Sequence, residues 1–386
     1  MHDVAIVGAG PGGSATAHFL AQRGVDVLLL DRSEFPRDKT CGDGLTPRAL
    51  RVLDAMGILA EVARLGCPID RYEVVAPNGK RTTSQTHALV VPRLKLDDVI
   101  VRRAIASGAT FRGSVAVDRV EPGPSGVIIH TRHEALHARY AVVATGAATG
   151  VLTRSSMLSA QPRAMLAARA YFEGVAAGTS FQLHFGGVPQ PGYGWVFPVG
   201  SDVANVGVGF LPRNHKVTAR AVFDTWVGAK LPQARMGSEM RGYPIRVDFL
   251  RAPTFAHRTL LVGEAAGLVN PLTGEGIDYA LESGQIAAEH LLRESFEPAQ
   301  YHSHLHARFA KVFRFSEYIR DWYCKPPLLN VLVPLANRRP ELRQLLTAIV
   351  LGERDPAGFG PLSMLARLLV YLVRTRSRTL HKASEG

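Results

Sequence analysis

The clearest chemical signal in the chain is a glycine-rich turn near its start. Gly8, Gly10 and Gly13 follow an apolar run at Gly-x-Gly-x-x-Gly spacing, and a segment compatible with a helix comes directly after them. The first glycine permits a tight turn, the second lets the backbone approach a pyrophosphate, and the third lets the helix lie close to the strand. The amides at the start of the helix, around Pro11 and Gly12, then face the phosphate charge. The spacing predicts a dinucleotide site.

A second apolar run, residues 25–30, ends at Asp31, about twenty residues beyond the first glycine. A carboxylate at this position accepts hydrogen bonds from the ribose of a dinucleotide, and the adjoining Arg32 is a further candidate for the cofactor site. The alternative is a glycine-rich turn that binds nothing. Since the motif alone does not separate FAD from NAD(P), that decision depends on the rest of the chain.

A polar loop after the second run carries a thiol. Residues 32–45 combine charged side chains with glycines and include Cys41 and Gly42, which favours a functional loop over a solvated connection with an inert cysteine. The next stretch, Thr46 to Leu65, predicts one helix with an apolar face. Farther on, Arg93 opens an amphipathic segment as Arg-x-x-Leu-Asp. Its guanidinium could hold the edge of a cofactor ring or belong to a salt-bridge network, and the residues leave both open.

Two later strand ends return to the nucleotide region. One apolar stretch ends at Thr145 and Gly146, which by residue type alone is a strand followed by a turn. Another ends at Gly263 and Glu264, and a glycine-rich loop then leads into a helix. Such an acid can reach the polar chain of a cofactor, and the helix N-terminal amides can face an electronegative ring edge. The cofactor candidates in this loop are Gly274, Gly276 and Ile277.

The middle of the chain carries an aromatic alternation. Tyr193, Trp195 and Phe197 alternate before a proline, and Gly207 and Gly209 follow as Gly-x-Gly. Side chains at alternate positions of a strand point to one face, so the three rings share a face. That face is either ordinary core or the wall of an apolar tunnel, where aromatic rings offer a large contact area to a hydrocarbon.

Composition describes a basic globular protein. The chain has 386 residues, 46% of them hydrophobic, and 45 basic against 33 acidic side chains give a net charge of +12. This balance attracts anions. No nucleic-acid motif accompanies it, so we expect no nucleic-acid partner. The basic residues gather towards the C-terminus, where Leu362 to Arg378 predicts an amphipathic helix on an anionic membrane, or else one packed on the core.

Cysteine usage and hydropathy bear on location. Three cysteines form no disulfide framework and favour a reducing compartment. Met1 leads directly into the first apolar run, and no apolar stretch reaches the length of about twenty residues that spans a bilayer. We therefore expect a cytoplasmic protein that touches the inner face of the cell membrane, and we expect no metal site.

Taken together, these motifs resemble the geranylgeranyl reductase family of FAD-dependent oxidoreductases, over about residues 3–292. The family's loop Pro-x-x-Lys-x-Cys-Gly is similar to Pro36 to Gly42, and its aromatic signature Tyr-x-Trp-x-Phe-Pro before Gly-x-Gly is matched from Tyr193 to Gly209. The resemblance implies FAD as the cofactor, Arg93 beside it, and an isoprenoid cavity lined by the aromatic segment. Two positions depart from related patterns: Thr145 replaces an aspartate, and Glu264 replaces the shorter aspartate.

The resemblance also implies an α/β fold with a Rossmann-like FAD-binding domain of the aromatic-hydroxylase flavoprotein type. Into it a β-sheet substrate domain is inserted, and a helical region ends the chain. The expected FAD-binding domain comprises residues 1–70, 90–150 and 252–295. The substrate domain comprises 71–89 and 151–251, and the helical region is 296–386.

The implied activity is saturation of C=C bonds in an isoprenoid chain, either of a prenyl quinone such as menaquinone or of a geranylgeranyl lipid. The loop around Cys41 looks most like the menaquinone isoprenyl reductases. Cys41 is the candidate proton donor or positioning group, and NAD(P)H or a ferredoxin-like protein is the expected electron donor. The alternatives are a flavin-dependent monooxygenase or halogenase of the same fold, and a non-catalytic flavin protein at a membrane.

Overall fold

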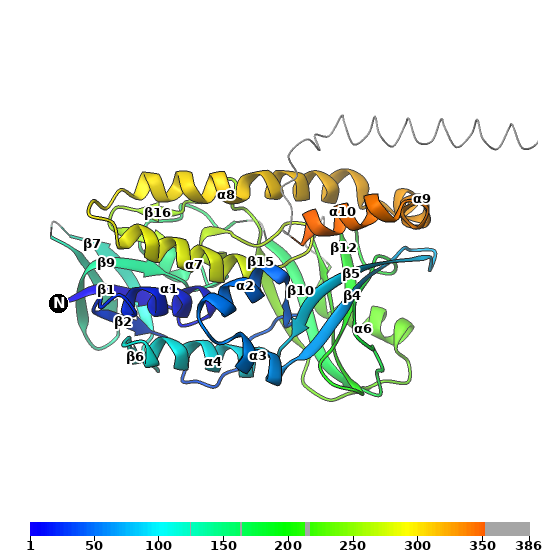
Figure 1. Cartoon of the computed structure of the whole chain (residues 1–386), viewed down its shortest axis with the longest axis horizontal. Helices are drawn as coiled ribbons and strands as arrows, with labels where there is room; N and C mark the ends of the chain where they lie inside the picture. The colour runs from blue at the N-terminus through cyan, green and yellow to red at the C-terminus, as the bar shows by residue number, and fades with distance from the viewer. Residues whose placement is uncertain (124, 163, 213–216, 352–386) are drawn as a thin grey trace, which may run out of the picture.

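The computed structural model describes residues 1–123, 125–162, 164–212 and 217–351. Two sheets lie side by side along the long axis of the molecule, and helices cover them (Figure 1). The N-terminus lies at the end of the molecule that is formed by the first sheet. Residues 362–378, for which a membrane helix is predicted, lie outside the described residues.

The first sheet has a parallel core centred on the N-terminal strand. Its order is β16-β17-β9-β1-β2-β6, and β7 and β8 extend from β9. Its strands are β1 (His2–Val7), β2 (Val27–Leu30), β6 (Thr110–Arg112), β7 (Val117–Pro122), β8 (Val127–Thr131), β9 (Ala135–Val143), β16 (Phe255–Ala256) and β17 (Thr259–Leu261). The strands β1, β2, β9 and β17 are parallel; β1, β2 and β17 are largely buried and nearly continuous apolar runs, and β9 is buried and apolar at its carboxyl end.

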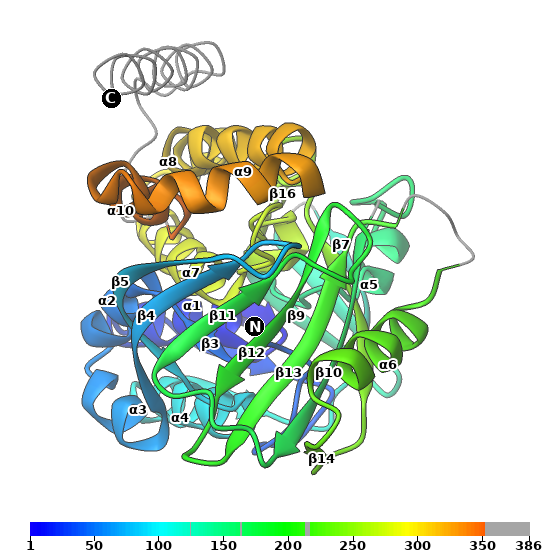
Figure 2. The ribbon, with the colours of Figure 1, turned by 90° about the vertical axis from the view of Figure 1, so that its right-hand side faces the viewer.

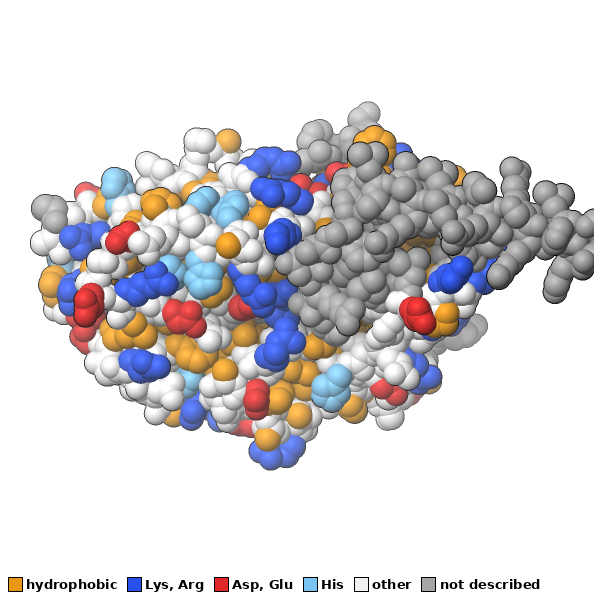
Figure 3. Space-filling model, turned by 45° about the horizontal axis from the view of Figure 1, so that its top comes forward, with side chains coloured by type: hydrophobic (Ala, Val, Ile, Leu, Met, Phe, Trp, Pro, Cys, Tyr) orange, Lys and Arg blue, Asp and Glu red, His pale blue; other side chains and the backbone are white. Residues whose placement is uncertain are grey.

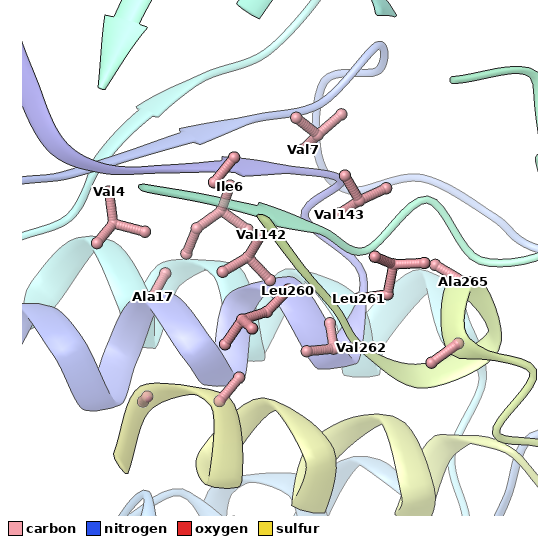
Figure 4. Close-up of a cluster of buried hydrophobic side chains, with 14 of the residues drawn as sticks. Val4, Ile6, Val7, Ala17, Val142, Val143, Leu260, Leu261, Val262 and Ala265 are labelled. Atoms are coloured by element: carbon pink, nitrogen blue, oxygen red, sulfur yellow. The ribbon is translucent and has the colours of Figure 1, made fainter. Parts of the chain in front are cut away.

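Three helices cover one face of this sheet: α1 (Pro11–Ala21), α4 (Arg93–Ala106) and α7 (Ile277–Leu291). Figure 4 shows Val4, Ile6, Val142 and Leu260 gathered between the strands and α1, which carries Ala17. The helices α1 and α7 approach closely because α7 has Gly284 at the contact, where Thr16 of α1 donates a hydrogen bond to its carbonyl at 3.1 Å.

The second sheet is formed mainly by antiparallel strands, in the order β14-β10-β13-β12-β11-β4-β5-β3, with β15 paired to β10. Its strands are β3 (Gly44–Leu45), β4 (Cys67–Val75), β5 (Arg81–Val90), β10 (Ala164–Glu173), β11 (Ser180–His184), β12 (Gly192–Pro198), β13 (Val203–Phe210), β14 (Arg235–Met236) and β15 (Arg241–Arg246). Helix α6 (Ala219–Lys230) packs on β10 and β13. The expected boundary at residue 151 falls within α5 (Gly150–Arg154), which packs on β7 of the first sheet.

The single helix predicted from Thr46 to Leu65 is wrong. The chain forms α2 (Pro47–Ala55) and α3 (Leu59–Leu65), separated by Gly57 at a φ of 71°. A residue with positive φ cannot continue a right-handed helix, and glycine adopts this conformation without strain. Leu50, Leu53 and Met56 are buried in one cluster.

The C-terminal part of the described chain is helical. It contains α8 (Pro298–Tyr318), a π-helical turn η2 (Ile319–Tyr323), α9 (Pro326–Asn337) and α10 (Pro340–Val350). Figure 2 shows α9 and α10 lying across the end of the second sheet near β4 and β5. Among the described residues, no helix combines the length and apolar character needed to cross a bilayer.

The close contact between α1 and α7 predicts a large effect of one methyl group. In Gly284→Ala the added Cβ would lie 2.4 Å from the Gly12 carbonyl oxygen, so the helices must separate. We expect the free energy of unfolding to fall by roughly 1–3 kcal/mol. The control is Gly228→Ala in α6, where a Cβ meets no atom within 4 Å and helix propensity should raise stability by up to about 1 kcal/mol. Urea unfolding measures both, and equal stabilities would contradict the packing described.

Candidate active site

One cavity of about 650 Å³ lies where the first sheet meets the second. It begins at the carboxyl ends of β1, β2 and β9, the usual ligand position in open α/β sheets. It continues to the aromatic residues of β12. All the predicted cofactor and substrate residues line it except Gly13 and Gly207, which have packing roles described below.

The nucleotide end is shaped by backbone contacts that exclude side chains. A Cβ on Gly8, which has a φ of 105°, would lie 2.5 Å from the Ala144 carbonyl oxygen, and one on Gly13 would lie 1.8 Å from the Gly8 carbonyl oxygen. Gly10 differs, since a Cβ there would meet only the Arg37 guanidinium, at 3.8 Å. The turn is therefore tight at Gly8 and Gly13 and open above Gly10, as an approaching pyrophosphate requires.

Asp31 fixes the edge of this turn. Its carboxylate accepts hydrogen bonds from the amides of Ala9 at 2.8 Å and Ser33 at 3.0 Å, one on each oxygen. Each oxygen keeps a second lone pair, and both Asp31 and Arg32 line the cavity. The arrangement suits the ribose of a dinucleotide.

Arg93 belongs to a buried salt-bridge network, the second of the two roles its sequence context left open. Its guanidinium donates two hydrogen bonds of 2.6 Å to Asp97, and Arg37 lies 3.1 Å from the same carboxylate. Asp97 raises the pKa of Arg93 against the opposing effect of burial. The charge of Arg93 also interacts with the Cys41 side chain, and both residues line the cavity.

Glu264 joins the two sheets at the cavity. One of its carboxylate oxygens accepts a 2.9 Å hydrogen bond from the amide of Arg246 on β15. Burial raises the pKa of Glu264 and lowers that of Lys39, and the charge of each opposes the shift of the other. The side chain that is one methylene longer than the family's aspartate is thus used to reach the second sheet, beside Thr145 and Gly146.

The three predicted aromatic rings form one wall. Tyr193, Trp195 and Phe197 line the cavity from β12, with successive ring centroids 6.3 Å apart. The intervening Gly194 faces the other side, where a Cβ would lie 2.3 Å from the Trp226 ring of α6. The alternation therefore separates a cavity face from a packed face.

The Gly-x-Gly segment on β13 accommodates the indole ring. Gly207 is paired with Trp195 across the strands, and a Cβ on Gly207 would lie 2.2 Å from that ring. Gly209 pairs with Tyr193 and lines the cavity. The glycines thus let Trp195 lie against its neighbouring strand, which is a packing reason for their spacing.

A buried polar network behind the wall was missed by the sequence reasoning. Asn205 accepts a hydrogen bond from the Trp195 indole at 2.9 Å and donates to the Asp43 carboxylate and the Cys41 carbonyl, both at 2.8 Å. The Tyr171 hydroxyl donates to Asp43 at 2.6 Å. The available signal was Asn205 itself, a polar residue in the otherwise apolar strand β13.

Comparison with known proteins agrees with this geometry. A family model described as an FAD binding domain matches residues 1–295. Over 385 residues the chain is 31% identical to a menaquinone reductase of Mycobacterium tuberculosis, with 90% of each protein covered. Over 305 residues it is 30% identical to digeranylgeranylglycerophospholipid reductase 1 of Methanopyrus kandleri, covering 74% of this chain and 79% of that protein. The chain belongs to the geranylgeranyl reductase family of FAD-dependent oxidoreductases.

Solved structures show the fold of this family member. A geranylgeranyl bacteriochlorophyll reductase-like protein from Thermoplasma acidophilum aligns with a TM-score of 0.76 at 22% identity, covering 90% of this chain and 99% of that one. A flavin-dependent brominase aligns with a TM-score of 0.77 at 18% identity, covering 97% and 99%. The predicted fold class and FAD cofactor are confirmed, and the open space above Gly10 and the lone pairs of Asp31 fit the ADP half of FAD.

The buried Asp43 predicts a pH dependence of stability. Burial raises its pKa to about 6, above the unfolded value of about 3.9. Its contribution to stability is therefore complete below pH 4 and is lost as the pH rises through 6. The Asp43→Asn variant has no such carboxyl group and does not show this loss. The difference in free energy of unfolding between the variant and the native protein should therefore shift in favour of the variant by on the order of 2–3 kcal/mol between pH 4 and pH 7.5. Urea unfolding at both pH values, at matched flavin content, tests this, and parallel pH dependences would refute it.

Proposed function

We propose that the protein saturates C=C bonds in the isoprenoid chain of a lipid, with a prenyl quinone such as menaquinone or a geranylgeranyl lipid as substrate. The observation that carries the proposal is the continuity of the cavity, which joins the FAD-binding turn at Gly10 to the aromatic wall of Tyr193, Trp195 and Phe197. The names of the related menaquinone and digeranylgeranylglycerophospholipid reductases support the same substrate class.

Different residues of the protein have different roles in this reaction. Bound FAD, once reduced, supplies a hydride to the alkene. The aromatic wall binds the hydrocarbon and excludes water from the reacting carbons. The Cys41 loop packs closely against this wall, since a Cβ on Gly42 would lie 3.2 Å from the Phe197 ring. The loop would therefore position the isoprenoid chain of the substrate along the wall. The cationic side chains Arg37, Lys39 and Arg93 line the same cavity and favour an anionic cofactor there.

The direct experiment is anaerobic turnover of the FAD-loaded protein with dithionite and a menaquinone, followed by mass spectrometry. We expect the quinone's isoprenoid chain to gain two hydrogens for each bond saturated. Parallel reactions with NADPH and with a reduced ferredoxin distinguish the proposed electron donors. No product under strong reductant would overturn the proposal in favour of a flavin carrier, and product formed only with oxygen would indicate a monooxygenase.

Cys41→Ala tests the role of the thiol in this reaction. The variant should keep its flavin absorbance, because the thiol lies beside the wall and the cradle glycines are unchanged. Turnover should fall at least about tenfold if the thiol positions or protonates the substrate. Cys67→Ala is the control, since Cys67 starts β4 and does not line the cavity. Undiminished turnover in Cys41→Ala would remove this residue from the chemistry.

We also propose that the protein works at the inner face of the cell membrane, where its lipid substrate resides. Figure 3 shows Lys and Arg side chains gathered on one face of the molecule. Helix α8 carries the exposed residues Arg308, Lys311 and Arg314. Trp322 of η2 and Val331 of α9 are 60% and 56% exposed. Lys325 lies over the Trp322 ring, with its Nζ atom 5.5 Å from the ring centroid. Exposed apolar side chains together with cations suit an anionic lipid surface.

Vesicle sedimentation tests this membrane proposal. The full chain should bind vesicles of anionic lipid several-fold more than neutral ones, and high salt should weaken the binding. Removal of residues 362–386 should reduce binding, because the sequence from Leu362 to Arg378 is amphipathic and ends in arginines. Binding that is unaffected by this truncation would count against the membrane role of the segment.

A further inference from the structure

Saturation of an alkene requires a proton as well as a hydride. Reduced FAD would supply the hydride, so the protein has to supply the proton. One carbon of the double bond receives the hydride with its electron pair, and the other receives a proton, so the product gains two hydrogens and the flavin is left oxidised. The donor must line the cavity and hold its proton at neutral pH. The carboxyl groups that line the cavity are those of Asp31, Asp38, Asp43, Glu264 and Glu275.

Three of these carboxyl groups are occupied as acceptors by hydrogen bonds or cations. Asp31 accepts two backbone amides. Asp38 lies 2.8 Å from Arg169 and 3.2 Å from Arg241. Asp43 accepts from Tyr171 and Asn205, and with a pKa of about 6 it is mostly ionised at neutral pH. Such groups hold charge in place and are poor proton donors.

Glu264 is also occupied. It accepts the amide of Arg246 and faces the charge of Lys39, which opposes the rise in its pKa. Its hydrogen bond to the Arg246 amide on β15 links the first sheet to the second. This leaves Glu275, whose Oε2 atom has no hydrogen-bond partner.

Glu275 differs from the other four in its surroundings. Its carboxyl group has a hydrogen bond with the Thr273 side chain, its Oε2 atom is buried without a hydrogen-bond partner, and no ion pair to it is found within the described part of the chain. An ionised carboxylate would leave that oxygen uncompensated, whereas a neutral acid carries a proton there or on the other oxygen. The residue is only partly buried and lines the cavity.

The loop that carries Glu275 is rigid and is held against the aromatic wall. The Glu275 carbonyl accepts a 2.8 Å hydrogen bond from the Asn270 amide, and the Asn270 side chain accepts the amides of Leu272 and Thr273. The Tyr193 hydroxyl donates to the Thr273 carbonyl. The acid is therefore two residues from a direct contact with the wall that would hold the hydrocarbon.

We propose that Glu275 is the neutral acid that delivers the proton to the alkene. This inference rests on the proposed function and deepens it by naming the donor. After delivery, the carboxylate takes a proton from water before the next cycle. Cys41, which lies across the same cavity, then acts in positioning the substrate.

The charges around Glu275 are consistent with this role. Burial raises the pKa of Glu275 well above that of an ordinary glutamate, and the negative charge of Asp278 on α7 raises it further. Arg48 of α2 opposes both effects. The hydrogen bond with Thr273 also lowers the pKa of Glu275. Tyr72 of β4 and Tyr193 of β12 carry nearby hydroxyls, whose pKa values are raised by burial and further by an ionised Glu275.

Glu275→Gln tests the proposal, because the amide imitates a neutral acid in shape but cannot donate its proton. We expect turnover to fall by about 100-fold or more, with flavin absorbance unchanged and thermal stability equal or higher. The control is Glu289→Gln on the exposed side of α7, the helix that follows the Glu275 loop, and it should leave all three measurements unchanged.

Infrared spectroscopy at pH 8 gives a second readout that requires no turnover. Asp43 and Asp278, with pKa values of about 6, are ionised there, so the remaining band of protonated carboxyl groups should lose intensity in Glu275→Gln and not in Glu289→Gln. Native turnover in Glu275→Gln, or an unchanged infrared band, would overturn the proposal. If the native protein saturates no isoprenoid, the proposed function fails, while the infrared result still decides whether Glu275 is a neutral acid.

Discussion

The site depends on buried carboxylates that accept hydrogen bonds from residues around one cavity. Glu264, at the end of a first-sheet strand, accepts the amide of Arg246 on β15. Asp43, beside Cys41, accepts from Asn205, which orients the Trp195 indole. The turn at Gly10 and the rings of β12 therefore line one cavity.

These bonds also explain how the cavity tolerates so many ionisable groups. A buried polar group is costly unless it is paired, and the carboxylates of Asp31, Asp43 and Asp97 each accept at least two hydrogen bonds. The pairing gives rigidity to loops that have little regular structure. Glu275 departs from this pattern because its Oε2 atom has no hydrogen-bond partner, and acids with a strongly shifted pKa in a cleft are common in catalytic sites.

Features governed by local backbone geometry were predictable from the sequence. The spacing of Gly8, Gly10 and Gly13 specified the nucleotide turn, and the alternation of Tyr193, Trp195 and Phe197 specified a shared face. Features that depend on tertiary contacts were not. The positive φ at Gly57 divides a pattern that reads as one helix, and the partners of Asn205, Cys41 and Asp43, come from a segment distant in the chain. The same limit applies to Arg93, whose salt-bridge role became clear only when Asp97 and Arg37 were placed around it.

A crystal structure of the protein with FAD and a prenyl quinone tests most directly whether the flavin and the isoprenoid chain share the cavity beside the aromatic wall. The structure described here predicts that the isoalloxazine ring lies beside Cys41 and Glu264, and that the isoprenoid chain runs along the rings of Tyr193, Trp195 and Phe197 with one double bond facing the flavin. An isoprenoid chain bound outside this cavity, or a flavin ring separated from the aromatic wall by protein, would contradict it.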